Sequence, residues 1–271
     1  MVWTVHNKEA HNQIIGKKYS KILMCLLLRW SSRIHVLCNA TLDEVPELQI
    51  WKKKVVMIPH GDYIGNFGEG NVNIREKYGI PADKKIILFT GKIGPYKNIE
   101  LLVNAFVKSQ LAKMNFALLL CGSCSNETYR KKLVLLADNS CPEIFYDFEY
   151  VPNELMGDYL NQSDILAAPY SKESILNSGT LWMAFSYKKS MICPLLACMK
   201  DVNGIDKITY TYDYENSGEH LTRLVQTLNI MGDDVHQNAS ILREKGYAAF
   251  LLMTKQTWAS SKQNWLNLYN F

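Results

Sequence analysis

The sequence predicts an α/β protein in which a doubly wound parallel sheet follows part of a second, smaller α/β domain. Two observations carry this prediction: short strand-like runs alternate with amphipathic helical segments, and most of those runs are almost continuously apolar. Near-continuous apolar strands are typical of a parallel sheet that helices cover on both faces. Strands and helices that alternate along the chain imply right-handed crossovers between parallel strands.

The larger domain is expected to begin near residue 51. Its strands, with the strand that leads into it, are expected at 54–58, 85–91, 116–122, 143–148, 164–169 and 190–194. The helices between them are expected around 98–110, 127–138, 153–162 and 177–188. After Gly204 the alternation gives way to helical patterns, which end in an aromatic-rich helix.

Residues 1–50 repeat the pattern on a smaller scale, with strands expected over 2–6 and 33–38 and a helix over 8–30. Two parallel strands alone would leave their edges unpaired. We therefore interpret this segment as the last part of an N-terminal α/β domain whose first strands are absent. Its unpaired edge at residues 1–6 favours self-association into a homo-oligomer. The expected domains are 1–50 for this part, 51–245 for the larger domain, and 246–271 for a C-terminal helix that packs back toward the N-terminal part.

The composition is that of an ordinary globular protein, since the 271 residues are 48% hydrophobic and 21% charged. The formal net charge of +4 suits a polyanionic small ligand or an anionic membrane surface. This bias is too weak to indicate a nucleic-acid partner, so none is expected.

The seven cysteines are odd in number and lie scattered in apolar stretches, which indicates reduced thiols in a cytoplasmic protein. Cys121 and Cys124 form one CxxC pair, which without a second pair cannot make a structural zinc site. The first residues lack the charged-then-apolar order of a secretory signal. The apolar run at 22–28 is too short to cross a bilayer.

The segment 84–106 is the most informative part of the sequence. A buried strand ends at Gly91, a short Gly/Pro loop follows, and a helix starts near Asn98. Ligands bind at the carboxyl ends of such strands, where the free amides and dipole of a helix N-terminus favour phosphate. Lys92 and Lys97 add two cations, each able to contribute up to roughly 4 kcal/mol of Coulomb energy at about 4 Å and an effective dielectric of about 20. The sequence therefore predicts a diphosphate site, the alternative being a solvated loop with unrelated lysines.

Two common nucleotide motifs are missing from this loop. Neither the Walker pattern nor G-x-G-x-x-G is present, which argues against an ATPase and against an NAD enzyme.

A second informative stretch runs from Tyr170 to Pro194. Glu173 is followed by a short apolar spacer and then by the four residues that open the next helix, Asn177, Ser178, Gly179 and Thr180. Asn177 or Ser178 is a natural N-cap, and the amides after it are expected to face the same crevice as the lysine loop. Glu173 is placed to accept hydrogen bonds from sugar hydroxyls; the alternative is a surface glutamate in a loop.

These stretches resemble GT-B glycosyltransferases of the family-4 type, the group 1 glycosyltransferases. FTGKIGPYKNIELLVNAF resembles their G-x-I-x-x-Y-K-G loop, and ESILNSGTLWMAFSYKKSMICP resembles their E-x7-E segment in a variant with Ser-Gly-Thr. VVMIPHGDY resembles the linker strand with its I-P-x-G turn, and YVPNELMGDYLNQSDILAAPY resembles the segment before the donor-site glutamate. WTVHN resembles the strand that carries the active-site histidine. The matches are in order and cover residues 1 to about 195.

The resemblance implies a role for each matching residue. Gly91, Lys92 and Lys97 would hold the donor diphosphate, with the lysines neutralising charge on the departing nucleotide. Glu173 would contact the transferred sugar, and Asn177 with the Ser178–Thr180 amides would bind phosphate or sugar hydroxyls. His6 would lie across the interdomain cleft near the anomeric carbon. No metal or other cofactor is expected, because the lysines replace the metal and no carboxylate cluster has ligand spacing.

Three departures from the family pattern stand out. Lys92 occupies a position where many relatives carry arginine, so a point charge replaces a bidentate fork. The second glutamate of E-x7-E falls on Leu181, and Lys188 and Ser190 replace a glycine and a proline before the next strand.

The resemblance implies a hexosyltransferase that moves a sugar from a nucleoside-diphosphate donor to a glycan or lipid-linked acceptor. It also implies retention at the anomeric carbon and a role in polysaccharide or glycoconjugate synthesis. One alternative is a non-catalytic nucleotide-sugar-binding or accessory protein, a shortened glycosyltransferase. Another is a sugar-nucleotide epimerase on the same fold, against which the Ser-Gly-Thr variant argues.

Residues 17–33 combine five basic side chains with an apolar centre and Trp30. Such a segment could lie peripherally on the anionic inner face of a membrane, as a lipid-linked acceptor would require. The alternative is an N-domain helix buried against its sheet.

Overall fold

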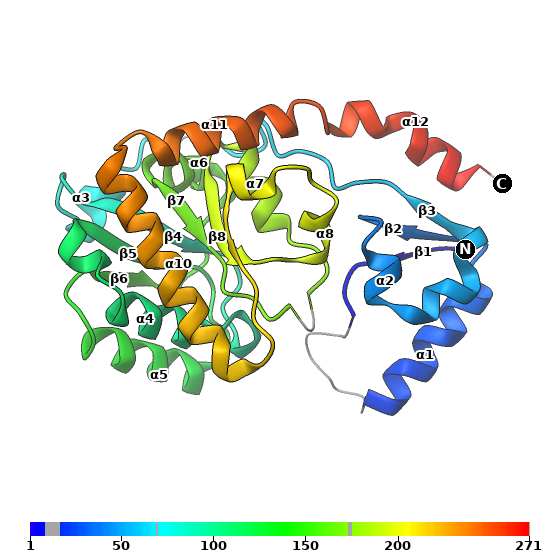
Figure 1. The fold of residues 1–271 in the computed structure, drawn as a ribbon, viewed down its shortest axis with the longest axis horizontal. Helices are drawn as coiled ribbons and strands as arrows, with labels where there is room; N and C mark the ends of the chain where they lie inside the picture. Colours follow the sequence, from blue (N-terminus) through cyan, green and yellow to red (C-terminus); the bar gives the residue numbers. More distant parts are fainter. Residues whose placement is uncertain (9–16, 69, 173–174, 271) are drawn as a thin grey trace.

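The computed structural model describes residues 1–8, 17–68, 70–172 and 175–270 (Figure 1). Within them the strands form two parallel sheets, one of three strands and one of six. The predicted α/β class with parallel sheets is therefore confirmed. No helix of the described chain is both long enough and apolar enough to span a membrane.

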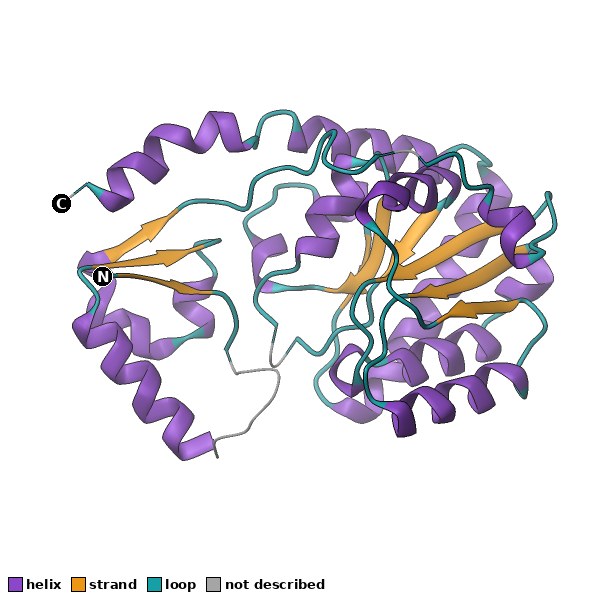
Figure 2. Cartoon of the chain, turned by 180° about the vertical axis from the view of Figure 1, so that it is seen from behind, coloured by secondary structure: helices purple, strands orange, loops and turns teal. Residues whose placement is uncertain are grey.

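The smaller sheet has the order β1-β2-β3, and its strands are Val2–Val5, Arg33–Val36 and Val55–Met57. One face of the sheet is covered by α1 (Lys17–Trp30), α2 (Thr41–Glu44) and the 3-10 segment η1 (Pro46–Lys54) (Figures 1 and 2). The opposite face is turned toward α12 (Trp258–Tyr269). We call this sheet with these helices the small lobe.

The larger sheet has the order β6-β5-β4-β7-β8-β9. Its strands are β4 Lys85–Thr90, β5 Phe116–Cys121, β6 Ile144–Asp147, β7 Ile165–Ala167, β8 Ser190–Pro194 and β9 Tyr210–Tyr212. After β4, the chain adds β5 and β6 on one side of β4, and then crosses over to add β7 on the other side. The strand order therefore reverses between β4 and β7, and ligands bind at the carboxyl ends of strands at such a switch point.

Helices cover both faces of the larger sheet (Figures 1 and 2). The longer ones are α4 Ile99–Lys108, α5 Glu127–Asp138, α6 Asn153–Gln162, α7 Gly179–Ser186, α10 Ser217–Gln237 and α11 Ile241–Met253. The short ones are α3 Ile74–Tyr78, η2 Pro95–Lys97, η3 Leu111–Met114, α8 Ala197–Lys200 and α9 Ile205–Ile208. Because both faces are covered, every residue of β5 is buried, as the apolar run predicts. We call this sheet with these helices the large lobe.

Three elements differ from the expectation. The strand expected at 54–58 was placed at the start of the larger domain. It forms β3, which pairs with β2 and therefore belongs to the small sheet. Residues 210–212 form a further strand, β9, which was not expected because it follows the end of the clear alternation. The C-terminal helix expected over 246–271 is two helices, because Thr257 caps a new helix with its side chain. Of the helix expected over 8–30, residue 8 is not helical, residues 9–16 lie outside the described residues, and the rest forms α1.

The chain passes between the lobes twice, and the two passages are bonded to each other. Gln256 donates from its side chain to the His60 carbonyl at 2.7 Å, and the Trp258 indole donates to the Asp62 carbonyl at 2.8 Å. A side chain at Gly61 would lie 2.2 Å from the Trp258 ring, so glycine allows this close approach. Beyond it, α12 places Trp265 at 4.7 Å from the His35 ring, against the small sheet.

Candidate active site

A cavity of about 310 Å³ lies where the small lobe meets the carboxyl ends of β4 and β7. Most of the side chains and glycines predicted from the sequence line it together: His6, Gly91, Lys97, Asn177, Ser178, Gly179 and Thr180. They come from three separate parts of the chain, namely the end of β1, the loop after β4, and the start of α7. The switch point of the sheet therefore brings the two informative stretches into one site.

Two glycines shape the loop after β4. Gly91 has a φ of +122° and Gly122, at the end of β5, has a φ of +145°. A Cβ on Gly122 would lie 1.8 Å from the Gly91 carbonyl oxygen, so only glycine fits at that position. The loop is held further by Asn98, whose side-chain amide donates to the Pro169 carbonyl at 2.9 Å. This bond ties the loop after β4 to the end of β7.

The two loop lysines differ in their surroundings. Lys97 is half-buried, and its ammonium lies 3.8 Å from the centre of the Tyr170 ring. The Tyr170 ring is buried, and its hydroxyl donates to the Thr180 hydroxyl at 3.2 Å. No carboxylate of the described chain forms an ion pair with Lys97, so this cation is available to an anion. Lys92 is exposed and lies outside the cavity lining, so the structure brings only one of the two lysines to the site.

The start of α7 offers polar groups to the cavity. Asn177 is buried, and its side-chain oxygen accepts a hydrogen bond from the Trp182 indole at 2.8 Å. Its amide nitrogen has no hydrogen-bond partner among the described residues. A buried donor without a partner costs about 1–3 kcal/mol, so an oxygen of a bound ligand would stabilise this site. Ser178 occupies the N-cap position, although its side chain makes no capping bond.

The small lobe reaches the site through the segment after β1. His6 is exposed at the cavity wall, and Asn7 forms an antiparallel bridge with Ile175. Lys8 forms an ion pair with Glu44, which also pairs with Lys200 of the large lobe at 2.5 Å. Although partial burial raises it, hydrogen bonds from Lys200 and Lys8 lower the pKa of Glu44 overall. These contacts fix the distance between His6 and the loops of the large lobe.

Glu173, predicted to contact the sugar, lies outside the described residues. The neighbouring Lys172 is held in place, because its backbone amide donates to the Tyr214 hydroxyl at 3.0 Å and its side chain forms an ion pair with Asp213. Ile175, on the other side, lines the cavity. The role of Glu173 stays a prediction.

Residues 71–175 match the family model described as "Glycosyl transferases group 1". The structure is similar to that of HepE from Anabaena in complex with UDP-glucose, with a TM-score of 0.73, 13% identity, and coverage of 98% of this chain and 71% of that chain. It is similar to sucrose-phosphate synthase from Thermosynechococcus elongatus, with a TM-score of 0.75, 15% identity, and coverage of 99% and 66%. The predicted resemblance to group 1 glycosyltransferases of the GT-B fold is confirmed.

A third similar structure is TarM, with a TM-score of 0.68 and 16% identity. The match covers 100% of this chain and 50% of TarM, so the chain spans about half the length of that protein. A comparison with curated protein sequences finds no match.

The departures from the group 1 pattern have structural counterparts. Leu181, at the position of the second glutamate, is fully buried in α7 and is not part of the cavity lining. Lys188, at the position of a common glycine, has a φ of +59°. This left-handed backbone explains why glycine is favoured there.

Three aromatic residues of the site were not predicted from the sequence. Tyr63 and Phe67 follow the linker turn, line the cavity and stack on each other at 5.9 Å. The Tyr63 hydroxyl lies 2.9 Å from where a Cβ of Gly179 would be, which explains the glycine. Tyr170 had a usable signal, because it directly follows a strand predicted to end at 169. Tyr63 and Phe67 had none, because nothing local indicates that the linker crosses the start of α7.

No group of three or more His, Cys, Asp or Glu side chains that could hold a metal ion occurs in the part of the chain that the structure describes. The expectation that the site needs no metal stays a prediction, which rests on Lys97 and the helix N-terminus as the positive groups.

Proposed function

We propose that this protein transfers a hexose from a nucleoside-diphosphate sugar to a glycan or lipid-linked acceptor, with retention at the anomeric carbon. The observation that carries the proposal is the cavity that groups His6, Lys97, Asn177 and the start of α7 at the sheet's switch point. The group 1 match over residues 71–175 and the similarity to a structure containing UDP-glucose support a nucleotide-sugar donor.

In this proposal the diphosphate lies between the loop after β4 and the N-terminus of α7. The amides of Gly179 and Thr180 and the positive end of the helix dipole stabilise its charge by about 0.3–2 kcal/mol. Lys97 contributes a full positive charge from the opposite side. Both act most strongly as the bond from the sugar to the phosphate breaks and negative charge develops on the departing diphosphate.

The remaining residues act on the sugar and the acceptor. The acceptor oxygen bonds to the anomeric carbon on the face that the diphosphate leaves, and the hydroxyl proton passes to the departing phosphate oxygen. His6 faces the reacting sugar from the small lobe and stabilises the charge that develops on it. Asn177 donates its unpartnered amide hydrogen to a ligand oxygen, and Glu173 accepts hydrogen bonds from the sugar.

A thermal-shift panel of UDP- and GDP-sugars, followed by donor hydrolysis, tests this function. We expect at least one nucleotide sugar to raise the melting temperature and to be hydrolysed slowly without an acceptor. Lys97→Ala should strongly reduce the shift and Lys92→Ala should reduce it less, because Lys92 lies outside the cavity. Lys131→Ala, on the exposed face of α5, is the matched control and should leave the shift unchanged.

The outcomes separate the alternatives. Stabilisation without hydrolysis, with or without acceptor, would support the non-catalytic nucleotide-sugar-binding protein. A converted sugar nucleotide without transfer would support the epimerase. A lack of response to every nucleotide would contradict donor binding altogether. The cytoplasmic location, the role in polysaccharide or glycoconjugate synthesis and the homo-oligomer remain proposals from the sequence.

A further inference from the structure

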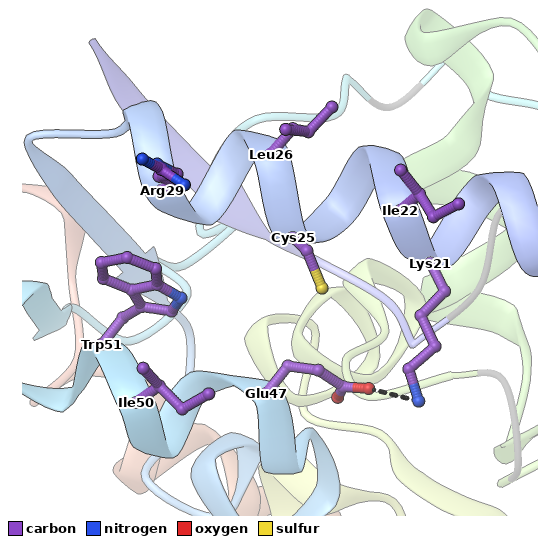
Figure 3. Close-up of a pocket in the computed structure, with 8 residues that line it drawn as sticks. All are labelled: Lys21, Ile22, Cys25, Leu26, Arg29, Glu47, Ile50 and Trp51. Carbon is purple, nitrogen blue, oxygen red and sulfur yellow. Dashed lines mark ion pairs between the residues drawn. The ribbon is translucent and has the colours of Figure 1, made fainter.

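An apolar groove of about 520 Å³ lies between α1 and η1, on the outer side of the small lobe (Figure 3). Its apolar lining consists of Ile22, Cys25, Leu26, Ile50 and Trp51. Lys54 holds its two sides together, because its ammonium donates to the carbonyls of Arg29 and Ser31 at 3.0 Å and lies 4.4 Å from the centre of the Trp51 ring. The groove is therefore a built feature of the lobe, distant in sequence from the donor site.

Several apolar side chains of α1 and η1, including two that line the groove, are unusually exposed for their type. Ile50 is 81% exposed, Trp30 63%, Ile22 49% and Leu23 47%. Only one face of α1 is covered by the sheet, since Leu28 is fully buried and Met24 is half-buried. Single exposed apolar side chains are common, whereas a continuous patch marks an interaction surface. The expectation of a helix buried against its sheet therefore holds for one face of α1 alone.

The rim of the groove is basic. Lys21 and Arg29 line it, and Lys52 and Lys53 lie exposed on the adjoining end of η1. Among the described residues that line the groove, Glu47 alone is acidic, and its carboxylate already forms an ion pair with Lys21 at 2.8 Å. The surface thus combines apolar side chains with an excess of positive charge.

A further strand paired with β1 would not cover this groove. The strand order is β1-β2-β3, with η1 leading into β3 and α1 leading into β2. The groove therefore lies on the side of α1 that faces β3. A further strand added to β1 would extend the sheet in the opposite direction, away from η1. Trp30 and the exposed Tyr19 add amphipathic rings of the kind enriched at membrane interfaces.

We propose that the α1–η1 face docks on an anionic lipid bilayer, with Ile22, Leu26 and Ile50 entering the headgroup region and the basic rim contacting lipid phosphates. Burial of apolar side chains and attraction between lysines and anionic headgroups act together in such peripheral binding. The charge of the rim selects this occupant over an apolar protein surface, which would leave the basic groups without counterparts. This docking is independent of the sugar-transfer proposal and can be measured without any nucleotide.

Vesicle flotation of the whole chain tests this surface. We expect the protein to float with vesicles of phosphatidylcholine and phosphatidylglycerol, to float poorly with phosphatidylcholine alone, and to detach as salt rises. The double variant Leu26→Asp, Ile50→Asp should lower the bound fraction more than tenfold. Lys52→Glu with Lys53→Glu should lower it by at least the roughly fivefold per charge expected for basic groups at an anionic surface.

Leu135→Asp is the matched control, because Leu135 is 63% exposed on α5 of the large lobe. It should float like the unmodified chain, and circular dichroism should show that every variant is folded. The proposal is overturned if the unmodified chain does not float, or if Leu135→Asp reduces flotation as much as the groove variant does. It is also overturned if size-exclusion chromatography shows a dimer that the groove variant dissociates while vesicles bind neither protein.

Discussion

The two sheets of this protein are both parallel, but they differ in how completely they are covered. In the large lobe, β5 and β8 are buried along their whole length between helices on both faces. In the small lobe, β1 and β3 retain partly or largely exposed positions. In the described chain the small sheet has one strand with neighbours on both sides, β2, whereas the large sheet has four, so a larger share of the small sheet consists of edge strands. Helix α12 supplies part of the cover of the small sheet.

The comparison extends to function. The large lobe contributes the constrained groups of the site: the Gly91 loop, Lys97 and the start of α7. The small lobe contributes one exposed histidine, His6, and an outward surface that is apolar and basic. In the proposed function, the large lobe binds the donor and the small lobe positions the acceptor against it.

The largest expected effect comes from the tight glycine contact of the large lobe. Gly122→Ala would place a Cβ 1.8 Å from the Gly91 carbonyl, so the loop must move or the sheet must open. We expect the free energy of unfolding to fall by more than about 3 kcal/mol, with donor binding lost. Gly65→Ala is the control, because Gly65 also has a positive φ (+74°) but open space around it. It should cost only about 1–2 kcal/mol in urea unfolding, the cost of the left-handed backbone alone; equal losses would contradict the steric argument.

The next prediction distinguishes the contribution of each lobe to the proposed reaction. Lys97→Ala should weaken binding of the nucleotide sugar at least about tenfold, because a hydrogen bond to a charged group contributes about 1.5–3 kcal/mol. His6→Ala should leave the affinity nearly unchanged and lower donor hydrolysis instead. Calorimetric titration and a turnover assay distinguish the two. If His6→Ala weakens binding as much as Lys97→Ala does, donor binding is not a property of the large lobe.

A smaller effect tests how Lys97 is positioned. Tyr170→Leu removes the ring 3.8 Å beneath the ammonium, whereas Tyr170→Phe keeps the ring and removes only the bond to Thr180. Because cation–π contacts contribute about 0.5–2 kcal/mol, the leucine variant should bind the donor several-fold more weakly, and the phenylalanine variant should bind almost normally. Equal affinities of the two variants would show that the ring does not position the lysine.

The smallest effect concerns acid sensitivity of the small lobe. Burial lowers the pKa of His35 from its ordinary 6.5. In its neutral form His35 donates to the Ile58 carbonyl at 2.9 Å and accepts from the Thr4 hydroxyl at 3.1 Å. The unfolded chain therefore binds a proton below about pH 6.5 that the folded chain does not, so stability is present above that pH and is lost as the pH falls through the folded pKa.

Thermal melting over a pH series measures this effect. His35→Gln should flatten the loss of stability on the acid side, although burial also lowers the pKa of His60 and so leaves part of it. His236→Gln, at an exposed position of α10, is the control and should not change the slope. An unchanged slope in His35→Gln would remove His35 as a source of the acid sensitivity.

The local parts of the fold were predictable from the sequence. The helices at 127–138 and 153–162 have the expected bounds. For each strand expected in the large lobe, the observed strand lies within the predicted range. Hydrophobic periodicity predicts these elements because it reflects which residues of a long segment are buried. Strand β9 was not predicted, because it follows the point at which the alternation of strands and helices fades and does not lie within a longer apolar run, unlike the equally short β3 and β7.

The partners of each element were harder to predict. Residues 55–57 were correctly expected as a strand, but the sequence does not say which sheet they join. Lys92 and Lys97 were equivalent as members of one loop. The 3-10 turn at Pro95–Lys97 separates them, since Lys97 at its end lines the cavity and Lys92 before it does not.

The sequence by itself determined the α/β class, the glycine-controlled loop after β4, and the family to which the ordered motifs point. These features depend on backbone conformation and burial, which neighbouring residues in the chain largely decide. Only the tertiary structure decided that Lys97 lies over Tyr170, that the Asn177 amide lacks a partner among the described residues, and that α1 and η1 form one apolar, basic face. Such contacts join segments far apart in the chain, and the crossovers of the two sheets bring them together.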